Sequence, residues 1–205
     1  MKTTVTKTLM GGVDGLNGIW FAFYDKVTGG FVDCGEPSVA KRFTISSGNT
    51  EIITNSNLFA YQGVGCKTDR EGTVTLTAKA DGITVKSFKV TLIHAYDVYY
   101  NNSKIPSTIN YTYTGSRDYL YFALYDKVDK TNVILCTSGG DMTTAYYNFV
   151  GTPSNGVVSK KTGVRLLGSG RGGYDVVFPV NYKGSCTITF TYGGVNVGSV
   201  KVNVN

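Results

Sequence analysis

The chain offers few residues whose types and spacing could support catalysis. Its 205 residues contain one histidine, His94, so a Ser-His-Asp or Cys-His arrangement could form only once. Nucleophilic catalysis by serine or cysteine needs such a base within hydrogen-bond reach. No Cys-x-x-Cys pair exists, and a single histidine disfavours a zinc site. We therefore expect no catalytic residue, no metal site, no cofactor and no small-molecule substrate: the protein is predicted not to be an enzyme.

One glycine-rich segment, residues 168–173, matches the G-x-G-x-x-G pattern of nucleotide-binding loops. That pattern binds phosphates where a strand precedes it and a helix begins after it, because the helix N-terminus supplies the N–H groups. Residues 174–180 predict a strand instead. We interpret the segment as a hairpin loop, with Arg171 at its tip as a candidate contact residue for a partner.

Asp25 and Asp126 stand at equivalent places, and each is followed by lysine. Such carboxylates could bind calcium or transfer protons. Calcium needs six or more oxygen ligands, and no run of Asp or Asn surrounds either position. We interpret each aspartate as the residue that fixes a turn by accepting backbone N–H bonds.

Both aspartates belong to an internal repeat. Residues 19–27 return as residues 120–128 with six of nine positions identical, and residues 71–82 match residues 183–194. The repeat predicts two domains of about 100 residues each, a common domain size. We place them at residues 1–94 and 95–205.

The repeated strand carries the candidate interface residues. Side chains alternate between the two faces of a strand, so Phe21 and Phe23 face the core and Trp20 and Tyr24 face away. The second copy likewise places Tyr121 and Tyr125 on the outer face. Two aromatics around a small alanine could form a docking patch for a protein or a platform for a sugar. They could also lie under loops or neighbouring strands.

The composition is typical of an all-β protein. Glycine is abundant at 26 residues, proline is scarce at 4, and valine, threonine and tyrosine are frequent. Asp81-Gly82 and Gly193-Gly194 predict tight turns in closing hairpins; an Asp-Gly turn of this kind takes positive φ at both residues. About seven short strands per unit predict a two-sheet antiparallel sandwich. Strands are expected at residues 2–9, 19–24, 42–45, 51–54, 58–61, 73–80, 83–93, 96–100, 109–113, 120–125, 133–136, 145–150, 163–167, 174–180, 186–192 and 195–204, with a short helix near 141–146.

The four cysteines are predicted to be buried free thiols. Cys34 and Cys136 occupy nearly equivalent places, but Cys66 and Cys186 do not align. A disulfide that defined the fold would recur in register in both units, so none is expected.

The charge distribution argues against a nucleic-acid partner. The net charge is +6, but the longest basic run is Lys160-Lys161. Nucleic-acid binders usually concentrate their charge on one face. The first ten residues contain no apolar stretch of signal-peptide length, and no segment has the length of a membrane span. We expect a protein made in the cytoplasm, with no membrane partner.

The end of each unit resembles a bacterial immunoglobulin-like (Big-type) domain. Residues 183–204 show the alternating β-branched strand, glycine turn and Val/Thr-rich last strand of that family, and residues 72–92 are similar. The resemblance implies two tandem immunoglobulin-like antiparallel β-sandwiches.

The same resemblance implies a binding or structural role. Such domains occur in adhesins and in virion proteins of tailed phages, and a small tandem protein resembles auxiliary (decoration) capsid proteins, such as those of crAss-like phages. We expect a virion protein that contacts the major capsid protein or other virion proteins in multiple copies. The alternative is a surface adhesin or glycan-binding module.

Overall fold

The chain folds into two compact units, unit 1 (Met1–His94) and unit 2 (Ala95–Asn205). The computed structural model describes residues 4–9, 18–34, 36–55, 57–58, 64–68, 70–115, 117–166 and 172–205, with only the backbone at residues 18, 20, 57 and 58. Strands dominate both units, so the prediction of an all-β fold is confirmed.

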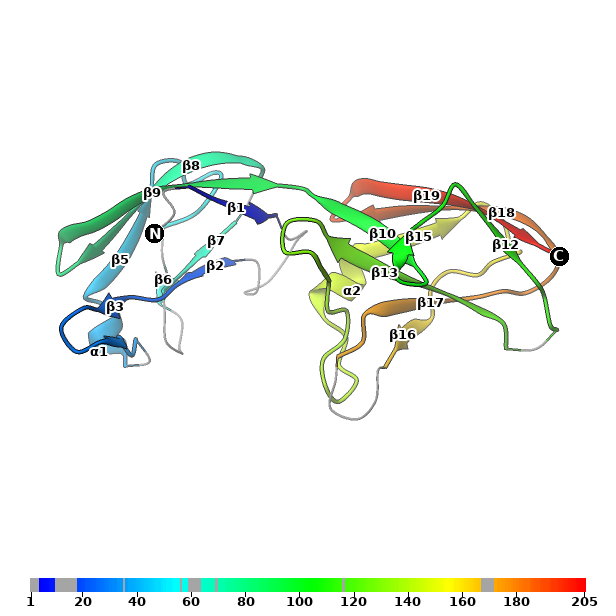
Figure 1. Ribbon diagram of the computed structural model, residues 1–205, viewed down its shortest axis with the longest axis horizontal. Helices are drawn as coiled ribbons and strands as arrows, with labels where there is room; N and C mark the ends of the chain where they lie inside the picture. Colours follow the sequence, from blue (N-terminus) through cyan, green and yellow to red (C-terminus); the bar gives the residue numbers. More distant parts are fainter. Residues whose placement is uncertain are drawn as a thin grey trace. The chain divides into compact units, whose positions relative to one another are not determined.

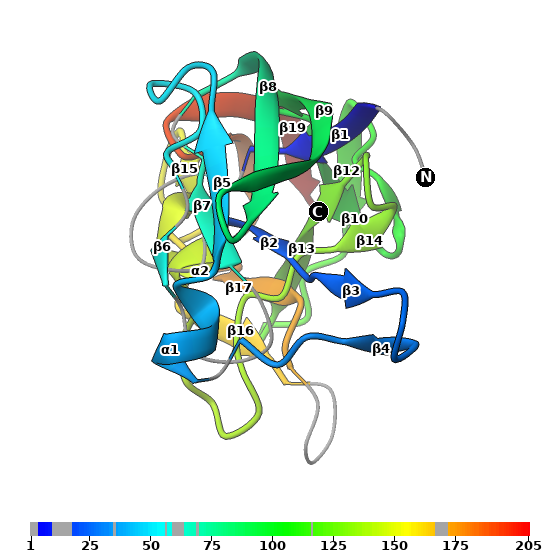
Figure 2. The same cartoon turned by 90° about the vertical axis from the view of Figure 1, so that its left-hand side faces the viewer.

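Unit 1 contains nine strands and one short helix among its described residues. They are β1 Thr4–Thr8, β2 Gly18–Phe21, β3 Tyr24–Asp25, β4 Gly30–Phe31, α1 Pro37–Ala40, β5 Phe43–Ser47, β6 Asn57–Leu58, β7 Val64–Lys67, β8 Gly72–Ala80 and β9 Ile83–Ile93. One sheet has the order β1-β9-β8-β5 and another the order β2-β7-β6, while β3 and β4 form a separate hairpin. Figure 2 faces this unit and shows β2, β3 and β4 in blue.

Unit 2 is built on the same plan with more strands. They are β10 Tyr96–Tyr100, β11 Ser103–Lys104, β12 Thr108–Tyr111, β13 Tyr119–Asp126, β14 Thr131–Asn132, α2 Thr144–Asn148, β15 Phe149–Pro153, β16 Gly163–Arg165, β17 Asp175–Pro179, β18 Gly184–Tyr192 and β19 Val195–Val204. One sheet has the order β12-β19-β18-β15; the other has the order β11-β10-β13-β17-β16, with β14 also paired to β13. Figure 1 shows the two sheets as separate layers.

The sheets are not wholly antiparallel, which corrects the predicted architecture. In unit 1, β1 runs parallel to β9, and in unit 2, β12 runs parallel to β19. A parallel pair needs a long crossover connection, and here most of each unit lies between the two paired strands. Local alternation of residues does not reveal such long-range pairing. The other strand pairs are antiparallel.

The closing hairpins form as predicted. Asp81 and Gly82 join β8 to β9 with φ of 48° and 79°, and Gly193 and Gly194 join β18 to β19 with φ of 57° and 82°. Positive φ at both central residues is the type I′ requirement, and it matches the right-handed twist of the flanking strands. These hairpins supply the longest strands of each unit.

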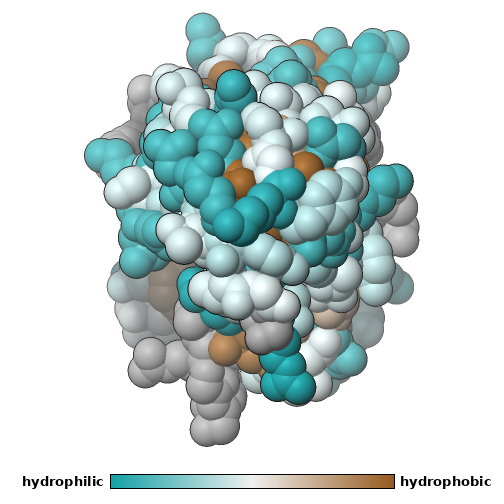
Figure 3. Space-filling model, turned by 90° about the vertical axis from the view of Figure 1, so that its right-hand side faces the viewer, coloured by the Kyte–Doolittle hydropathy of each residue, from teal (hydrophilic) through white to brown (hydrophobic). Residues whose placement is uncertain are grey.

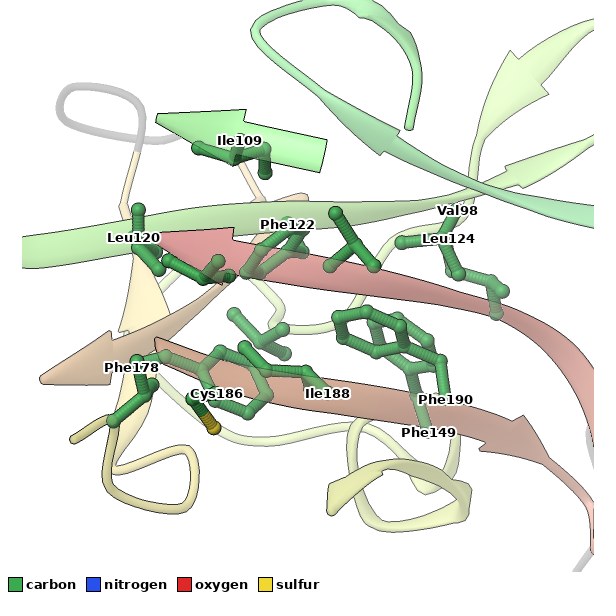
Figure 4. Close-up of a cluster of buried hydrophobic side chains, with 14 of the residues drawn as sticks. Val98, Ile109, Leu120, Phe122, Leu124, Phe149, Phe178, Cys186, Ile188 and Phe190 are labelled. Atoms are coloured by element: carbon green, nitrogen blue, oxygen red, sulfur yellow. The ribbon is translucent and has the colours of Figure 1, made fainter. Parts of the chain in front are cut away.

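The core of unit 2 lies between its two sheets, whose inward side chains meet in Figure 4. Phe122 of β13 and Phe178 of β17 meet edge to face, with ring centroids 5.5 Å apart. Phe190 of β18 meets Phe178 at 5.9 Å. Aromatic pairs in this geometry add about 0.5–1.5 kcal/mol each beyond the burial of their area. This cluster therefore joins the two sheets.

Four segments depart from the predicted strands. The strand predicted at residues 19–24 is interrupted, because β2 ends at Phe21 and β3 begins at Tyr24.

Residues 50–52 form a turn, because Asn49 accepts N–H bonds from Glu51 and Ile53, and Ile53 forms only an isolated bridge to Thr68. Asparagine often offers the backbone such local bonds in place of a sheet ladder. Residues 145–150 were predicted as a strand, but they form most of α2 and the start of β15. The helix predicted near residues 141–146 overlaps α2 at residues 144–146. The strand predicted at residues 133–136 is replaced by β14 at Thr131–Asn132.

All four cysteines are free and buried, as predicted. Cys186 lies in the core of unit 2 beside Ile188 and Phe190 (Figure 4). In unit 1, burial raises the pKa of Cys66 to about 12 and also raises the pKa of Cys34. The thiolate is the reactive form of cysteine, so these thiols are inert in the folded chain.

We expect the folded protein to resist thiol reagents. At pH 8, a disulfide reagent such as dithionitrobenzoate should label almost none of the four cysteines in the native chain and all four in denaturant. Absorbance of the released thiolate measures the difference. Rapid labelling of any cysteine in the native protein would contradict the burial described above.

A glycine in β15 tests how tightly the core of unit 2 is packed. A Cβ atom at Gly151 would lie 2.4 Å from Phe178 Cζ, whereas one at Gly163 meets nothing within 4 Å. We expect Gly151→Ala to lower the free energy of unfolding by about 1–3 kcal/mol, the usual cost of overpacking. Gly163→Ala, the matched control, should change it by less than about 0.5 kcal/mol. Urea titrations compare the two, and equal effects would contradict this packing.

Candidate functional site

Strand β13 divides its side chains between the two faces of the sheet. Leu120, Phe122 and Leu124 are fully buried, whereas Tyr121 and Tyr125 are half-buried. The predicted separation of a core face from an aromatic outer face is thus confirmed for this strand. The outer face of β13 is the starting point of the candidate site.

The aspartate at the end of the repeated strand fixes a turn in each unit. The Asp126 carboxylate accepts N–H bonds from Val128 and Asp129, at 2.8 and 3.0 Å. Asp25 accepts the equivalent bonds from Val27 and Thr28, and these bonds lower the pKa of Asp25. The interpretation of these carboxylates as turn residues is confirmed.

A second tyrosine covers one side of the outer face. Tyr99 of β10 lies opposite Ala123 in the register of the sheet. Its ring stacks on the Tyr125 ring, with centroids 4.2 Å apart and an interplanar angle of 9°. Burial, Tyr125 and Asp97 raise the pKa of Tyr99, so its hydroxyl stays protonated and can donate a hydrogen bond.

An arginine covers the other side. The Arg165 guanidinium of β16 lies 4.4 Å from the centre of the Tyr121 ring and pairs with the Asp175 carboxylate of β17. Asp175 in turn lies opposite Ala123 in the register. A guanidinium over an aromatic face gains about 0.5–1 kcal/mol at exposed sites. The ion pair and the ring thus hold the Arg165 side chain in one orientation.

These side chains enclose a hollow of about 210 Å³ on the outer face of unit 2, here called the Tyr121 hollow. Ala123 is 5% exposed and forms part of its lining, between the flanking rings. The lining residues are Tyr99, Asn101, Asn102, Tyr121, Ala123, Asn132, Arg165 and Asp175. The hollow combines flat aromatic surface with amide, guanidinium and carboxylate groups, which suits recognition of a polar group beside an apolar one.

The described lining of the Tyr121 hollow contains no Ser, Cys, Lys or His side chain; its titratable groups are those of Tyr99, Tyr121, Arg165 and Asp175. Within the described residues, no group of three or more His, Cys, Asp or Glu is placed to hold a metal ion. No helix in the described part is both long and apolar enough to span a membrane. The arrangement can bind by stacking and hydrogen bonding.

Of the five predicted interface residues, the structure brings two together. Tyr121 and Tyr125 lie on the same face of β13, on either side of Ala123. In unit 1, Tyr24 is exposed and its ring meets Phe31 at 5.5 Å. The Trp20 side chain and all of Arg171 lie outside the described residues.

The remaining lining residues come from strands that sequence patterns did not connect to β13. Arg165 and Asp175 lie on β16 and β17, whose register places them opposite one another. Tyr99, which lies on β10, was likewise not among the predicted interface residues. Cross-sheet register is a long-range property, so the spacing of residues within one strand cannot reveal it.

The end of unit 2 that faces the viewer in Figure 3 has a different character. Hydrophilic and neutral side chains cover most of it, and apolar atoms occur in small separate spots. Exposed apolar residues scattered singly are normal on a protein surface.

No protein-family model and no characterised protein sequence matches the chain. Solved structures that are similar include domains 5-6 of the S-layer protein SbsC, at 19% identity and a TM-score of 0.32, covering 99% of this chain and 93% of that one. The Escherichia coli adhesin FdeC is similar at 12% identity and a TM-score of 0.33, covering 100% of this chain and 62% of that one. A beta-glycosidase from Bacteroides vulgatus is similar at 12% identity and a TM-score of 0.30, covering 79% and 21%. Likeness at such TM-scores carries no conclusion about function.

The ion pair beside the Tyr121 hollow is only partly exposed: the Arg165 side chain is 48% exposed and the Asp175 side chain 16%. We expect Arg165→Met, which keeps most of the apolar stem, to lower the free energy of unfolding by about 1–3 kcal/mol, because it leaves the Asp175 carboxylate without this partner. Urea titration measures the change, and an unchanged free energy of unfolding would show that the ion pair does not support the fold.

Proposed function

We propose that this chain is a non-enzymatic structural protein that attaches to a larger assembly through the outer face of unit 2. The observation that carries the proposal is the Tyr121 hollow, where one tyrosine stack (Tyr99–Tyr125) and one arginine–tyrosine pair (Arg165–Tyr121) lie on the face that the core does not use. An exposed sheet face is normally polar. Aromatic and arginine side chains supply most of the energy at protein interfaces.

The arrangement of these rings favours attachment. The Tyr99–Tyr125 pair and the Tyr121–Arg165 pair are ordered before any partner arrives. Ordering flexible side chains in advance lowers the entropy cost of binding. A modest contact of this kind becomes strong when many copies bind one assembly. The site therefore suits a protein that is used repeatedly on a repetitive surface.

The assembly that we propose is the virion of a tailed phage, with the chain as an auxiliary capsid protein. Support comes from the closing strands of both units, which resemble bacterial immunoglobulin-like domains of the kind found in virion proteins, and from the duplicated β unit. The partners would be the major capsid protein or other virion proteins, in multiple copies.

Attachment of defined variants to purified particles tests this function. We expect the chain in intact virions and expect Tyr121→Ala to reduce its occupancy about tenfold, the effect of losing one interface anchor. Tyr182→Ala is the matched control, because Tyr182 is exposed in unit 2 but does not line the hollow. Quantitative mass spectrometry measures the occupancy. Virions without the chain would disprove the virion assignment, and equal occupancy of both variants would disprove the role of the hollow.

A second candidate function is glycan binding, as in a surface adhesin. The observation that favours it is the set of polar side chains that line the same hollow as Tyr121, namely Asn101, Asn102, Asn132 and Asp175. Amides and carboxylates beside an aromatic face suit the hydroxyls and the apolar face of a sugar. Retention on a glycan array that Tyr121→Ala abolishes would support this function, and no retention would count against it.

A further inference from the structure

The two units differ at one edge of their repeated strand. In unit 2, β10 pairs with β13 from Phe122 to Asp126. The equivalent residues of unit 1 lie 101 positions earlier, at Phe21 to Asp25, and are here called the 21–25 edge. Among the described residues, β2 pairs only with β7 and β3 only with β4. The described part of unit 1 thus has no strand in the place of β10.

Along the 21–25 edge, where the described residues place no counterpart of β10, the side chains are more exposed than their equivalents in unit 2. In unit 2, Phe122 and Leu124 are fully buried and Ala123 is 5% exposed. In unit 1, Phe21 and Phe23 are only partly buried, and Ala22 is exposed. Partial exposure of these phenylalanines forgoes hydrophobic stabilisation that covering them would supply. The edge therefore has apolar surface to offer a partner.

The core of unit 1 also has less bulk at this place. In unit 2, Tyr96 of β10 is buried and its ring meets Tyr192 edge to face, with centroids 4.7 Å apart. Ala80 of unit 1 stands at the position of Tyr192 in the matched hairpin, and it is only partly buried. An incoming aromatic side chain in the place of Tyr96 would meet the small Ala80 instead of a tyrosine ring.

Lys26 of unit 1 offers a β10-like strand the same backbone donor and the same charge that Lys127 offers β10 in unit 2. In unit 2, the Lys127 N–H donates to the Ala95 carbonyl, at 3.0 Å, and the Lys127 ammonium lies 3.7 Å from the Asp97 carboxylate. The equivalent residue of unit 1 is Lys26, which is exposed. Within the described part of the chain, the Lys26 N–H has no acceptor. A strand that enters like β10 would satisfy this donor and could place a carboxylate near this lysine.

We infer that the 21–25 edge binds an extended strand of another protein, which adds to the sheet as β10 does in unit 2. The occupant has apolar side chains at its first, third and fifth positions, like Tyr96, Val98 and Tyr100, and an acidic residue at the second, like Asp97. Sheet-edge addition gains affinity from backbone hydrogen bonds and specificity from alternate side chains. The inference rests on the proposed function in one respect only: the protein that supplies the strand is taken to be a neighbour in the same assembly.

Hydrogen exchange of the full-length chain tests the inference with a peptide of residues 95–101, the β10 sequence, as the probe. We expect the peptide to slow the exchange of the backbone amides of residues 21–26 about tenfold or more at saturation. The amides of residues 122–127 are the internal control, since β10 already covers them. A peptide with Val98→Asp should have no effect, because Val98 is the buried anchor of β10.

Two variants at Lys26 distinguish the contribution of its backbone N–H to peptide binding from that of its side-chain charge. Lys26→Pro removes the N–H that should donate to a carbonyl of the incoming strand, and we expect it to weaken peptide binding about tenfold, as for one lost hydrogen bond. Lys26→Ala keeps the N–H and removes only the ammonium, so its effect should be about threefold or less. The urea midpoint of each variant shows whether unit 1 remains folded.

Three outcomes would overturn the inference. The first is no slowing at residues 21–26 while residues 122–127 stay protected. The second is slow exchange at residues 21–26 without peptide at every protein concentration, since the chain would then cover its own edge. The third is protection without peptide that rises with protein concentration, since a second copy would then be the occupant. The attachment of Tyr121→Ala to virions is a separate readout, so failure here leaves the proposed function standing.

Discussion

The central constraint on this protein is that successive side chains of its repeated strand point to opposite faces of the sheet. In unit 2, pairing on both edges of β13 fixes which side chains face the core. With β10 on one side and β17 on the other, β13 cannot shift by one residue without exposing Phe122 and burying Tyr121. The packing of Leu120, Phe122 and Leu124 between the sheets therefore sets the outer face as well as the core. The Tyr121 hollow is a direct product of that register.

Duplication gave the two units one plan, and the differences between them show what each part of the plan does. Where β10 is present, the alanine between the aromatic positions becomes the floor of an enclosed hollow. Where no described strand takes that place, the equivalent Ala22 is exposed and the strand is interrupted between Phe21 and Tyr24. One edge strand thus distinguishes the outer face of unit 2, which carries the Tyr121 hollow, from the equivalent exposed face of unit 1.

Local sequence patterns predicted much of the fold. The closing hairpins were evident because Asp81-Gly82 and Gly193-Gly194 adopt a conformation that few other pairs tolerate. The burial of Cys186 followed from its alternation with Ile188. The parallel pairs β1–β9 and β12–β19 were not predicted, because they join segments separated by most of a unit. The turn at Asn49 was missed for the opposite reason, because it is local: the Asn49 side chain accepts the Glu51 N–H, and the Asn49 carbonyl accepts the N–H groups of Ile52 and Ile53, which offsets the strand preference of the two isoleucines. The candidate site was found in part, since Tyr121 and Tyr125 share a strand, whereas Arg165 and Asp175 reach them only through the sheet.

The short passage from β9 to β10 has a mechanical consequence. Only His94 and Ala95 separate Ile93, the last residue of β9, from Tyr96, the first residue of β10. Tension along the chain therefore passes from the final strand of one unit directly into a strand that the other unit needs for its core. The bond from the Lys127 N–H to the Ala95 carbonyl and the contact of Tyr96 with Tyr192 stand at the point of loading. Under pulling, unit 2 is loaded at β10 and at its last strand β19, and loss of β10 would open the hollow and the core together.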